Sequence, residues 1–377
     1  MNNYWQSDPA GVLRIPVARP RLPLAAEIVP YLRRIDEAQW YSNGGPLVTE
    51  LEHRLAFHFG DENTTVATVA NATIGLTLAL FACDLPRPSL CMVPAWTFAA
   101  SAHAIEFAGL VPWIVDVDET SWSLSAEMAR ALLRDAPGQV SAVMPVAPFG
   151  APIDFVAWEK FREETGIAVV IDAAASFDTL RATQIPAVVS LHATKLLGAG
   201  EGGLVVINDA NFGQQVQQRA NFGFWNSREA KMQSLNGKLS EYAAAVGLAA
   251  LDGWPETRAD FAGVARVYGE VFAEQDRFRL QSGLGENWVS STVVATTPPG
   301  TADAARHSLG EKQIGTRRWW GGGLHRHRAF AHCPRLATPV TDGLADGTIG
   351  LPCWRDLPPE LIAKICAALF ASTGACA

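Results

Sequence analysis

Lys195 is the residue whose type and position most directly suggest covalent chemistry. It follows the apolar run 185–190 and precedes the glycine-rich segment 198–203. A lysine amine that is desolvated where a strand end opens into a crevice is a candidate nucleophile. A solvated loop lysine fits the local spacing equally well, because most lysines lie on the surface. The residues around it must therefore decide between the two interpretations.

Other polar or aromatic residues also follow apolar runs that we interpret as strands. They are Asp172 after 167–171, Ser190 after 185–189, Asn71–Thr73 after 66–70 and Phe98 after 89–93. Because strand ends meet at one edge of a doubly wound sheet, we expect these side chains in one crevice. Free N–H groups at the start of the helix after Asn71 favour a phosphate, although a plain capped helix gives the same signal.

These residue types match what an aldehyde cofactor with a phosphate and a basic ring nitrogen requires. A lysine forms the Schiff base, a carboxylate holds the pyridinium proton, an aromatic ring stacks, and N–H and hydroxyl donors bind the phosphate. Taken alone, Asp172 is more simply a cap of the next turn. The coincidence of all the features predicts pyridoxal 5'-phosphate (PLP) as the cofactor.

The elements that must position these residues alternate between strands and helices. The expected helices are 25–41, 48–59, 76–83, 99–108, 126–133, 155–165, 211–220, 239–251, 256–274 and 361–370, and the expected strands are 66–70, 89–93, 112–117, 140–146, 167–172, 185–190, 203–208 and 288–297. Alternation predicts the α/β class, with a large domain whose mostly parallel sheet is covered by helices. A change of composition near Gly253 predicts a smaller C-terminal α+β domain.

We place an N-terminal arm at 1–30, the large domain at 31–252 and the small domain at 253–377. The arm is rich in proline and arginine and is expected to wrap a partner surface.

Composition excludes several classes of protein. The 377 residues carry a net charge of -8, and only 18% of them are charged, so there is no broad basic surface for nucleic acid or an anionic membrane. No signal-peptide pattern or apolar run of transmembrane length is present. We therefore expect a cytoplasmic protein with neither nucleic acid nor membrane as partner. The six cysteines show no zinc or disulfide spacing.

Two rival motifs are set aside. The segment 198–203 matches G-x-G-x-x-G, but a strand rather than a helix follows it, so it is not a dinucleotide fingerprint. His325, His327 and His332 lack the paired spacing of a helical zinc site, so no metal is predicted there.

Over residues 25–370 the chain resembles the DegT/DnrJ/EryC1/StrS family of sugar aminotransferases, which are fold type I PLP enzymes. The motifs that carry the resemblance are Trp40-Tyr-Ser-Asn-Gly-Gly-Pro46, Asn71-Ala-Thr73, Pro94-Ala-Trp-Thr-Phe98, Asp172-Ala-Ala, Ser190-Leu-His-Ala-Thr-Lys195 and Gly200-Glu-Gly-Gly203. Their order and spacing together are highly specific.

The resemblance implies a role for individual residues. Lys195 matches the lysine of the internal aldimine, and Asp172 matches the partner of the ring nitrogen. Further cofactor contacts are implied for Phe98, Ala72, Thr73 and Ser190. Asn236 matches an asparagine that reaches the phosphate of the neighbouring subunit, which implies a homodimer with a shared active site.

Two positions depart from the family pattern. Ala175 stands where the family usually has Gln or His near the ring hydroxyl, and alanine cannot form that hydrogen bond. Lys238 replaces the usual arginine two residues after the phosphate asparagine, which keeps the charge but loses bidentate geometry.

The activity implied is transfer of an amino group from glutamate or glutamine to a keto group of a nucleotide-linked deoxysugar, through the Lys195 aldimine and a pyridoxamine phosphate intermediate. Such enzymes serve deoxyamino sugar and polysaccharide biosynthesis. Lys195 argues against the dehydratase branch of the family, in which histidine replaces the lysine. Candidate substrate contacts are His192, Arg317, Trp320 and His325, although Trp319 and Trp320 fit packing within the small domain equally well.

Two alternatives stay open. A regulatory or non-catalytic PLP-binding member of the family is supported only by Ala175. A fold type I lyase such as a desulfurase would need a reactive cysteine loop, which the sequence does not place near the strand ends.

Overall fold

The computed structural model describes residues 15–372, so residues 1–14 of the predicted arm and residues 373–377 lie outside it. The helices are α1 (Ala25–Ala38), α2 (Pro46–Phe59), α3 (Ala72–Ala82), α4 (Ala99–Phe107), α5 (Ala126–Leu132), α6 (Phe155–Thr165), α7 (Ala210–Ala220), α8 (Glu241–Asp252), α9 (Trp254–Phe272), α10 (Ala302–Glu311), α11 (Pro339–Gly347) and α12 (Pro359–Ala371). Short 3-10 turns lie at η1 (Leu133–Asp135), η2 (Pro148–Gly150), η3 (Leu324–Arg326) and η4 (Arg328–Phe330).

The strands are β1 (Thr65–Val69), β2 (Leu90–Pro94), β3 (Val111–Val115), β4 (Val140–Val143), β5 (Ala168–Val169), β6 (Ile171–Asp172), β7 (Ala187–Ser190), β8 (Gly203–Ile207), β9 (Arg279–Leu280), β10 (Val293–Thr296) and β11 (Thr348–Leu351).

A large sheet forms the centre of the molecule. Its two halves run in the orders β1-β8-β7-β6 and β3-β2-β4-β5. The halves join because β5 and β6 are one stretch of chain separated only by Val170, whose N–H donates to the Val143 carbonyl of β4. Only β8 runs against its neighbours β1 and β7, while the other pairs within the two halves are parallel. The prediction of a mostly parallel sheet is therefore confirmed.

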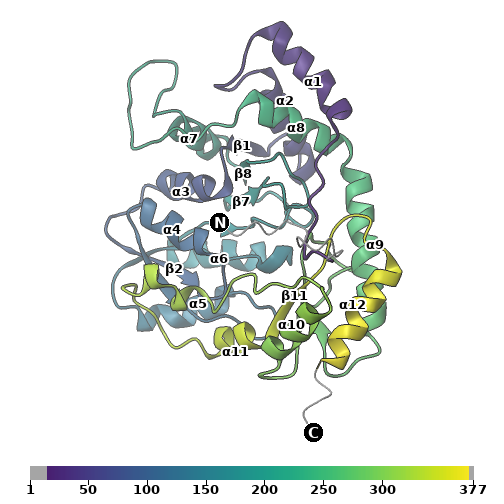
Figure 1. Cartoon of the computed structure of the whole chain (residues 1–377). Coiled ribbons are helices and arrows are strands. Elements are labelled where there is room, and N and C mark those ends of the chain that lie inside the picture. Colours follow the sequence, from purple (N-terminus) through teal and green to yellow (C-terminus); the bar gives the residue numbers. More distant parts are fainter. Residues whose placement is uncertain (1–14, 373–377) are drawn as a thin grey trace.

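Helices cover both faces of the sheet because its strands are apolar on both sides. In β1, Val66 packs into the core with α2, α5 and α6, whereas Ala67 and Val69 pack with α3, α4 and α7. The small residues of α3 and α4 allow these two helices to lie close to the sheet and to each other. Figure 1 shows α3 and α4 stacked side by side against the strands.

Side-chain caps fix where several helices begin. Asn71 accepts the Ile74 N–H at the start of α3, Ser240 accepts the Ala243 N–H at α8, and Asp209 caps α7. Each cap satisfies a backbone donor that lacks an intrahelical acceptor. The predicted helical run begins at residue 76, whereas α3 begins at Ala72, directly after the Asn71 cap that the sequence suggests.

A second, antiparallel sheet in the order β11-β10-β9 packs with α9, α10 and α12. These helices gather to one side of the large sheet (Figure 1). The expected strand 288–297 is shorter than predicted: only Val293–Thr296 are paired as β10, while Trp288 and Val289 are buried in a preceding turn.

The segment after α10 does not stay with this smaller sheet. Leu324, Phe330 and Cys333 pack into the core that covers α3 and α4. Ile114 of β3 exchanges backbone hydrogen bonds with Pro334 and Leu336, so residues 334–336 extend the edge of the large sheet. The chain from 324 to 336 therefore belongs spatially to the large sheet. The domain division at residue 253 did not anticipate this return.

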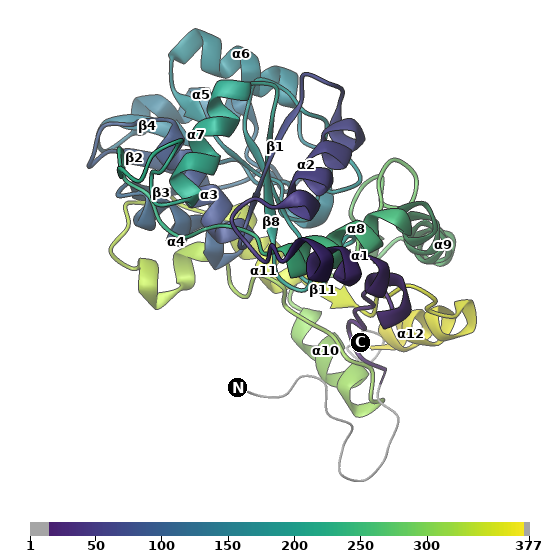
Figure 2. The same ribbon diagram turned by 90° about the horizontal axis from the view of Figure 1, so that it is seen from above.

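The described part of the N-terminal arm contacts its own chain. Ile15 pairs with Ile314 and Ala18 pairs with Cys353, and the Val17 carbonyl accepts the Cys353 N–H. In Figure 2 this purple segment runs beside the small sheet and α12. Edge pairing with the small sheet satisfies part of the backbone of residues 15–18, and the expectation that the arm wraps a partner surface stays a prediction. Residues 1–14 lie outside the described residues.

Among the described residues, no helix is long and apolar enough to cross a membrane. The described cysteines are all free thiols.

Candidate active site

The carboxyl edge of the large sheet brings three of the predicted segments together. Gly203, the first residue of β8, pairs with Val69 at the end of β1 and with Ser190 at the end of β7. Because β8 runs in the opposite direction, its start lies at the edge where its neighbours end. Ser190 and the beginning of α3 are therefore separated only by the Gly203 backbone.

Gly203 has to be glycine for this approach. A Cβ at this position would lie 2.7 Å from the Ala72 nitrogen. The side chain of Asn71 uses the Ile74 N–H, so the N–H groups of Ala72 and Thr73 remain without intrahelical acceptors. This helix start is an anion-binding arrangement, with the helix dipole adding to the N–H donors.

Asp172 is buried at the end of β6, with 5% of its surface exposed. Its Oδ2 accepts a hydrogen bond of 2.7 Å from the Ser101 hydroxyl, and its Oδ1 accepts the Ala174 N–H at 3.1 Å. Burial raises the pKa of Asp172, and the two donors and the charge of Lys195 partly offset this rise. The carboxylate is thus held in place by fixed donors.

Ser101 is a residue of this site that sequence reasoning missed. It lies on the first turn of α4, and its hydroxyl also contacts the Thr97 hydroxyl at 2.8 Å. A serine three residues after a strand-end aromatic resembles any small helical residue, so only the tertiary structure shows that it points at Asp172. The Thr97–Ser101–Asp172 chain ties α4 to the end of β6.

Lys195 lies in the turn after β7 and interacts electrostatically with Asp172. Burial lowers the pKa of the Lys195 amine, and the negative charge of Asp172 opposes this effect. A lowered pKa increases the neutral amine, which is the nucleophilic form. The backbone N–H of Lys195 donates to the His192 carbonyl at 2.9 Å, which closes the turn.

Phe98 precedes α4 and exposes 60% of its surface, although it is a large apolar residue. The neighbouring Trp96 is buried instead and makes edge contacts with Phe149 and Trp320. The exposed Phe98 ring is thus available as a stacking surface near the helix that carries Ser101.

His192 and Asn236 lie in two different loops, one after β7 and one before α8. His192 Nδ1 accepts the Thr194 N–H at 3.2 Å, and its Nε2 lies 3.8 Å from Glu201. Asn236 is exposed, and its side-chain oxygen accepts a 2.7 Å hydrogen bond from Lys238. The adjacent Gly237 carbonyl accepts the Ala70 N–H, which places this loop beside the end of β1.

The remaining predicted substrate residues do not form one group. Trp320 stacks on Phe149, with ring centroids 4.1 Å apart, at the end of β4. His325 Nε2 lies 3.0 Å from Asp342, which Arg326 also binds. Arg317 lies over the Trp319 ring and pairs through its backbone with Gly350 of β11. Trp320 contacts the aromatic cluster of Trp96 and Phe149 directly.

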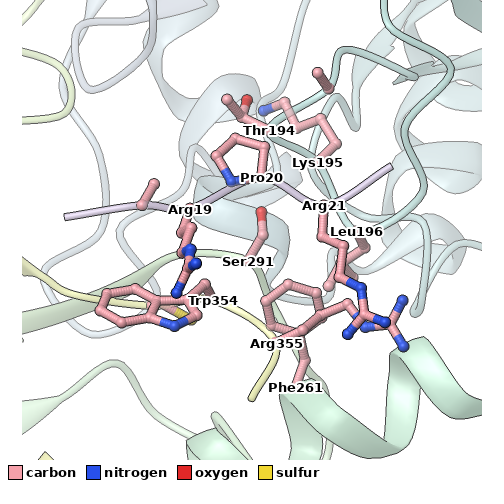
Figure 3. A pocket seen from close by; sticks show the side chains of 13 residues that line it. Arg19, Pro20, Arg21, Thr194, Lys195, Leu196, Phe261, Ser291, Trp354 and Arg355 are labelled. Carbon is pink, nitrogen blue, oxygen red and sulfur yellow. The ribbon is translucent and has the colours of Figure 1, made fainter. Parts of the chain in front are cut away.

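A narrow pocket lies beside Lys195 and is lined by parts of the chain that the sequence did not connect (Figure 3). Arg19, Pro20 and Arg21 of the arm cross one side of it, and Trp354 and Arg355 lie below them. The pocket encloses about 20 Å³, room for a single water. Arg355 is already paired with Asp260, whereas Arg19 and Arg21 are exposed.

Comparison with known proteins finds relatives that match most of this chain. The model of the DegT/DnrJ/EryC1/StrS aminotransferase family matches residues 23–370. Protein Rv3402c of Mycobacterium tuberculosis is 29% identical, covering 96% of this chain and 91% of that protein. The dTDP-4-amino-4,6-dideoxy-D-glucose transaminase of Escherichia coli is 26% identical, covering 93% of this chain and 96% of that protein.

Solved structures give the same result for the fold. DesI, crystallised with its TDP-sugar product, superposes with a TM-score of 0.85 at 28% identity and covers 96% of this chain and 93% of its own. A Bacillus cereus structure named as a PLP-dependent aminotransferase has a TM-score of 0.90 at 26% identity and covers 95% and 100%. The predicted fold type I architecture is confirmed, and the chain belongs to the DegT/DnrJ/EryC1/StrS aminotransferase family.

Proposed function

We propose that this chain is a PLP-dependent aminotransferase that moves an amino group from glutamate or glutamine to a keto group of a nucleotide-linked deoxysugar. The observation that carries the proposal is that Lys195 interacts electrostatically with the buried Asp172 at the edge that also holds Ser190 and the α3 start. Relatives named as transaminases of dTDP- and UDP-linked sugars support the substrate class.

The residues at this edge fit PLP. The free N–H groups of Ala72 and Thr73 and the Ser190 hydroxyl are suitable donors for its phosphate. The close approach at Gly203 leaves this cradle open, because a side chain there would fill it. Asp172 would hold the ring nitrogen, and the exposed Phe98 face would stack on the ring.

Each group of the chain then has a defined task. When bound, PLP supplies an electron sink for the carbon that carries the amino group. The Lys195 amine would hold the aldehyde carbon and, once released, would take a proton from the α-carbon of the amino donor and deliver it to the carbon that bore the aldehyde. Asp172, kept in position by Ser101 and the Ala174 N–H, would balance the positive charge of the ring nitrogen. The lowered pKa of Lys195 favours the neutral base that this proton transfer needs.

A carboxylate-bearing amino donor is supported by the arginines near Lys195. Arg19 and Arg21 are exposed at the mouth of the pocket in Figure 3. Guanidinium groups suit carboxylates because they offer paired donors. Since the pocket itself has room for only about one water, we propose that these arginines contact a donor carboxylate from its mouth.

A homodimer with a shared active site is also part of the proposal. Large aromatic residues are exposed near the predicted partner-facing residue Asn236: they are Trp40, Tyr41, Phe222, Trp225 and Tyr242. Exposed apolar area of this kind is typical of an interface. Phe98 is exposed as well, so a partner subunit could complete the site around it.

A desulfurase-type activity has less support. Cys353 lines the pocket beside Lys195, but burial raises its pKa to about 12. The thiolate, which is the nucleophile, is therefore scarce near neutral pH. The regulatory alternative rests on Ala175, which places its backbone carbonyl against Gly150 and offers no polar side chain. Cytoplasmic location stays a prediction.

Half-transamination tests the proposed function. The protein reconstituted with PLP should show a visible absorbance band that glutamate bleaches, with one equivalent of 2-oxoglutarate formed. Lys195→Ala should lack the lysine-dependent absorbance band. Its rate of half-transamination should be about 10⁴-fold lower, because the nucleophile and the proton carrier are the same group. Lys160→Ala on the exposed face of α6 is the matched control and should behave as wild type.

Two outcomes would contradict the proposal. If Lys195→Ala kept the band and the rate, Lys195 would not hold the cofactor. If the wild-type protein bound PLP but glutamate and glutamine both left the spectrum unchanged, the regulatory alternative would be favoured. A screen of nucleotide-linked ketosugars for return of the band then identifies the acceptor.

A further inference from the structure

A cluster of three metal-ligating side chains lies away from the active site, between α4 and the segment after η4. Glu106 comes from the last turn of α4, and His332 and Cys333 come from the segment that returns to the large sheet. One ligand atom of each residue lies within 4.8 Å of the other two. We propose that Glu106, His332 and Cys333 bind a divalent transition metal, and that zinc is the ion that fits them best.

The two distances from His332 to the other ligand atoms are close to those of a zinc site. His332 Nε2 lies 3.2 Å from Glu106 Oε1 and 3.7 Å from Cys333 Sγ. With zinc bonds of about 2.0–2.3 Å, neighbouring ligand atoms of a tetrahedral site lie about 3.3–3.6 Å apart. The same imidazole nitrogen thus faces both a carboxylate oxygen and a sulfur at the required separation.

The ligand types select among metals. One thiolate, one imidazole and one carboxylate form a mixed sulfur, nitrogen and oxygen set, which suits Zn²⁺ and is unsuited to Ca²⁺ or Mg²⁺. Three protein ligands leave one tetrahedral position for water. His103 lies one turn before Glu106, with its Nδ1 3.6 Å from Glu106 Oε2, and is placed to orient that carboxylate.

The two halves of the cluster are held by separate parts of the fold. Cys333 is 4% exposed and packs in the core with Leu324 and Phe330, and its N–H donates to the Phe330 carbonyl. Residues 334–336 are then fixed by their pairing with Ile114. On the other side, the His103 ring contacts Phe330, with centroids 4.7 Å apart, which aligns α4 with the returning segment.

An ordinary surface ion pair explains less of this arrangement. The Glu106 and His332 side chains are 29% and 65% exposed, and ion pairs of that exposure contribute little. An ion pair between Glu106 and His332 does not require the Cys333 sulfur to lie next to the same imidazole nitrogen. The thiolate is the form that binds a metal, so binding transfers the Cys333 thiol proton to the solvent, about one proton per metal ion.

The site would have a structural role. A metal ion there would join the end of α4 to the segment that closes over it, in addition to the packing of Phe330. The first turn of α4 carries Ser101, and Phe98 precedes it, so the joint would brace the helix that positions these residues. From the sequence alone no metal is predicted at His332, because Glu106 is far along the chain from it and no local spacing links them.

Cobalt binding tests the proposal without any catalytic assay. The full-length protein is stripped with EDTA and titrated with Co²⁺ in weakly buffered solution. We expect about one Co²⁺ per chain, a thiolate-to-cobalt charge-transfer band, release of about one proton and displacement by Zn²⁺. Zn²⁺ should also raise the melting temperature of the stripped protein, because it binds only the folded state.

Variants assign the ligands. Cys333→Ser should remove the charge-transfer band, and His332→Ala and Glu106→Gln should each weaken binding by about 100-fold or more. His332 is largely exposed, so His332→Ala is expected to fold even if Cys333→Ser does not. His327→Ala, an exposed histidine on the same segment, is the matched control and should bind as wild type. Absence of stoichiometric binding, or binding that His332→Ala and Glu106→Gln leave unchanged, would overturn the proposal.

Discussion

Two carboxylates of this protein, the buried Asp172 and the half-buried Glu52, have similar partners and different surroundings. Asp172 accepts hydrogen bonds from the Ser101 hydroxyl and the Ala174 N–H. Glu52 of α2 accepts the hydroxyl and the N–H of Thr68 in β1, both at 2.8 Å, and the amide of Gln217. Burial raises the pKa of both, and that of Glu52 reaches about 7.

Asp172 differs from Glu52 in two respects: a cation acts on it, and it lies at the edge of the sheet. Lys195 lowers the pKa of Asp172, whereas Glu52 has only neutral donors around it. Asp172 ends β6 at the carboxyl edge of the sheet, while Glu52 packs against the middle of β1. A perturbed pKa therefore marks a candidate catalytic group only where an opposite charge and a strand end accompany it. Glu52 has the perturbation without the site.

Between these two carboxylates, the larger expected effect on catalysis comes from removing the charge of Asp172 at the sheet edge. Asp172→Asn keeps the shape of the side chain but cannot hold a positive ring nitrogen, so kcat should fall by about 10²–10³-fold. Steady-state kinetics with glutamate and an accepted ketosugar measure it. The matched change Glu52→Gln should leave kcat within about twofold, because that carboxylate is remote from the strand ends. Equal effects of the two substitutions would remove the distinction drawn between them.

Removal of the Ser101 hydroxyl, which positions Asp172, should have a smaller effect on kcat. Ser101→Ala should lower kcat by about 10-fold, since a hydrogen bond to a charged group contributes about 1.5–3 kcal/mol. That bond lowers the pKa of Asp172, so its loss should move the acidic limb of the pH–rate profile to higher pH.

Two further serine variants separate positioning from packing. Ser101→Thr should have the kcat of the wild type and the same acidic limb of the pH–rate profile, because the hydroxyl is kept. Ser89→Ala removes a buried serine that contacts Ser141 and no carboxylate, and should alter neither. A Ser101→Ala profile with an unmoved acidic limb would show that Ser101 acts only through packing.

Glu52 should affect stability alone. Its folded pKa of about 7 lies above the ordinary value of 4.5, so the protonated form is favoured in the folded state. The stabilisation is full below about pH 4.5 and is lost as the pH rises through 7, a change of about 3 kcal/mol. Glu52→Gln should flatten this dependence and raise the free energy of unfolding at pH 8 by about 1–3 kcal/mol, because a neutral amide has no ionisation cost.

Urea unfolding at several pH values measures the Glu52 effect, with Glu50→Gln on the exposed face of α2 as control. A pH dependence in Glu52→Gln that equals that of wild type would show that Glu52 ionises normally.

Much of the site could be predicted because its residues follow strand ends. Asp172, Ser190 and Asn71 each terminate or follow an apolar run, and the doubly wound topology then determines that they meet. The register of β8 makes the meeting close, since Gly203 pairs with the ends of both β1 and β7. The bounds of two elements were less predictable. Trp288 and Val289 are buried without belonging to β10, which makes that strand shorter than expected, and the start of α3 depends on the single cap residue Asn71.

By itself, the sequence determined the order of strands and helices, the lysine and carboxylate pair and the family resemblance, since each depends on local pattern and spacing. Only the tertiary structure decided that Ser101 supports Asp172, that Arg19 and Arg21 lie beside Lys195, and that His325 binds Asp342. It also decided that Glu106 meets His332 and Cys333. These contacts join residues far apart in the chain, and packing of the returning segment and the arm, which no local pattern encodes, brings them together.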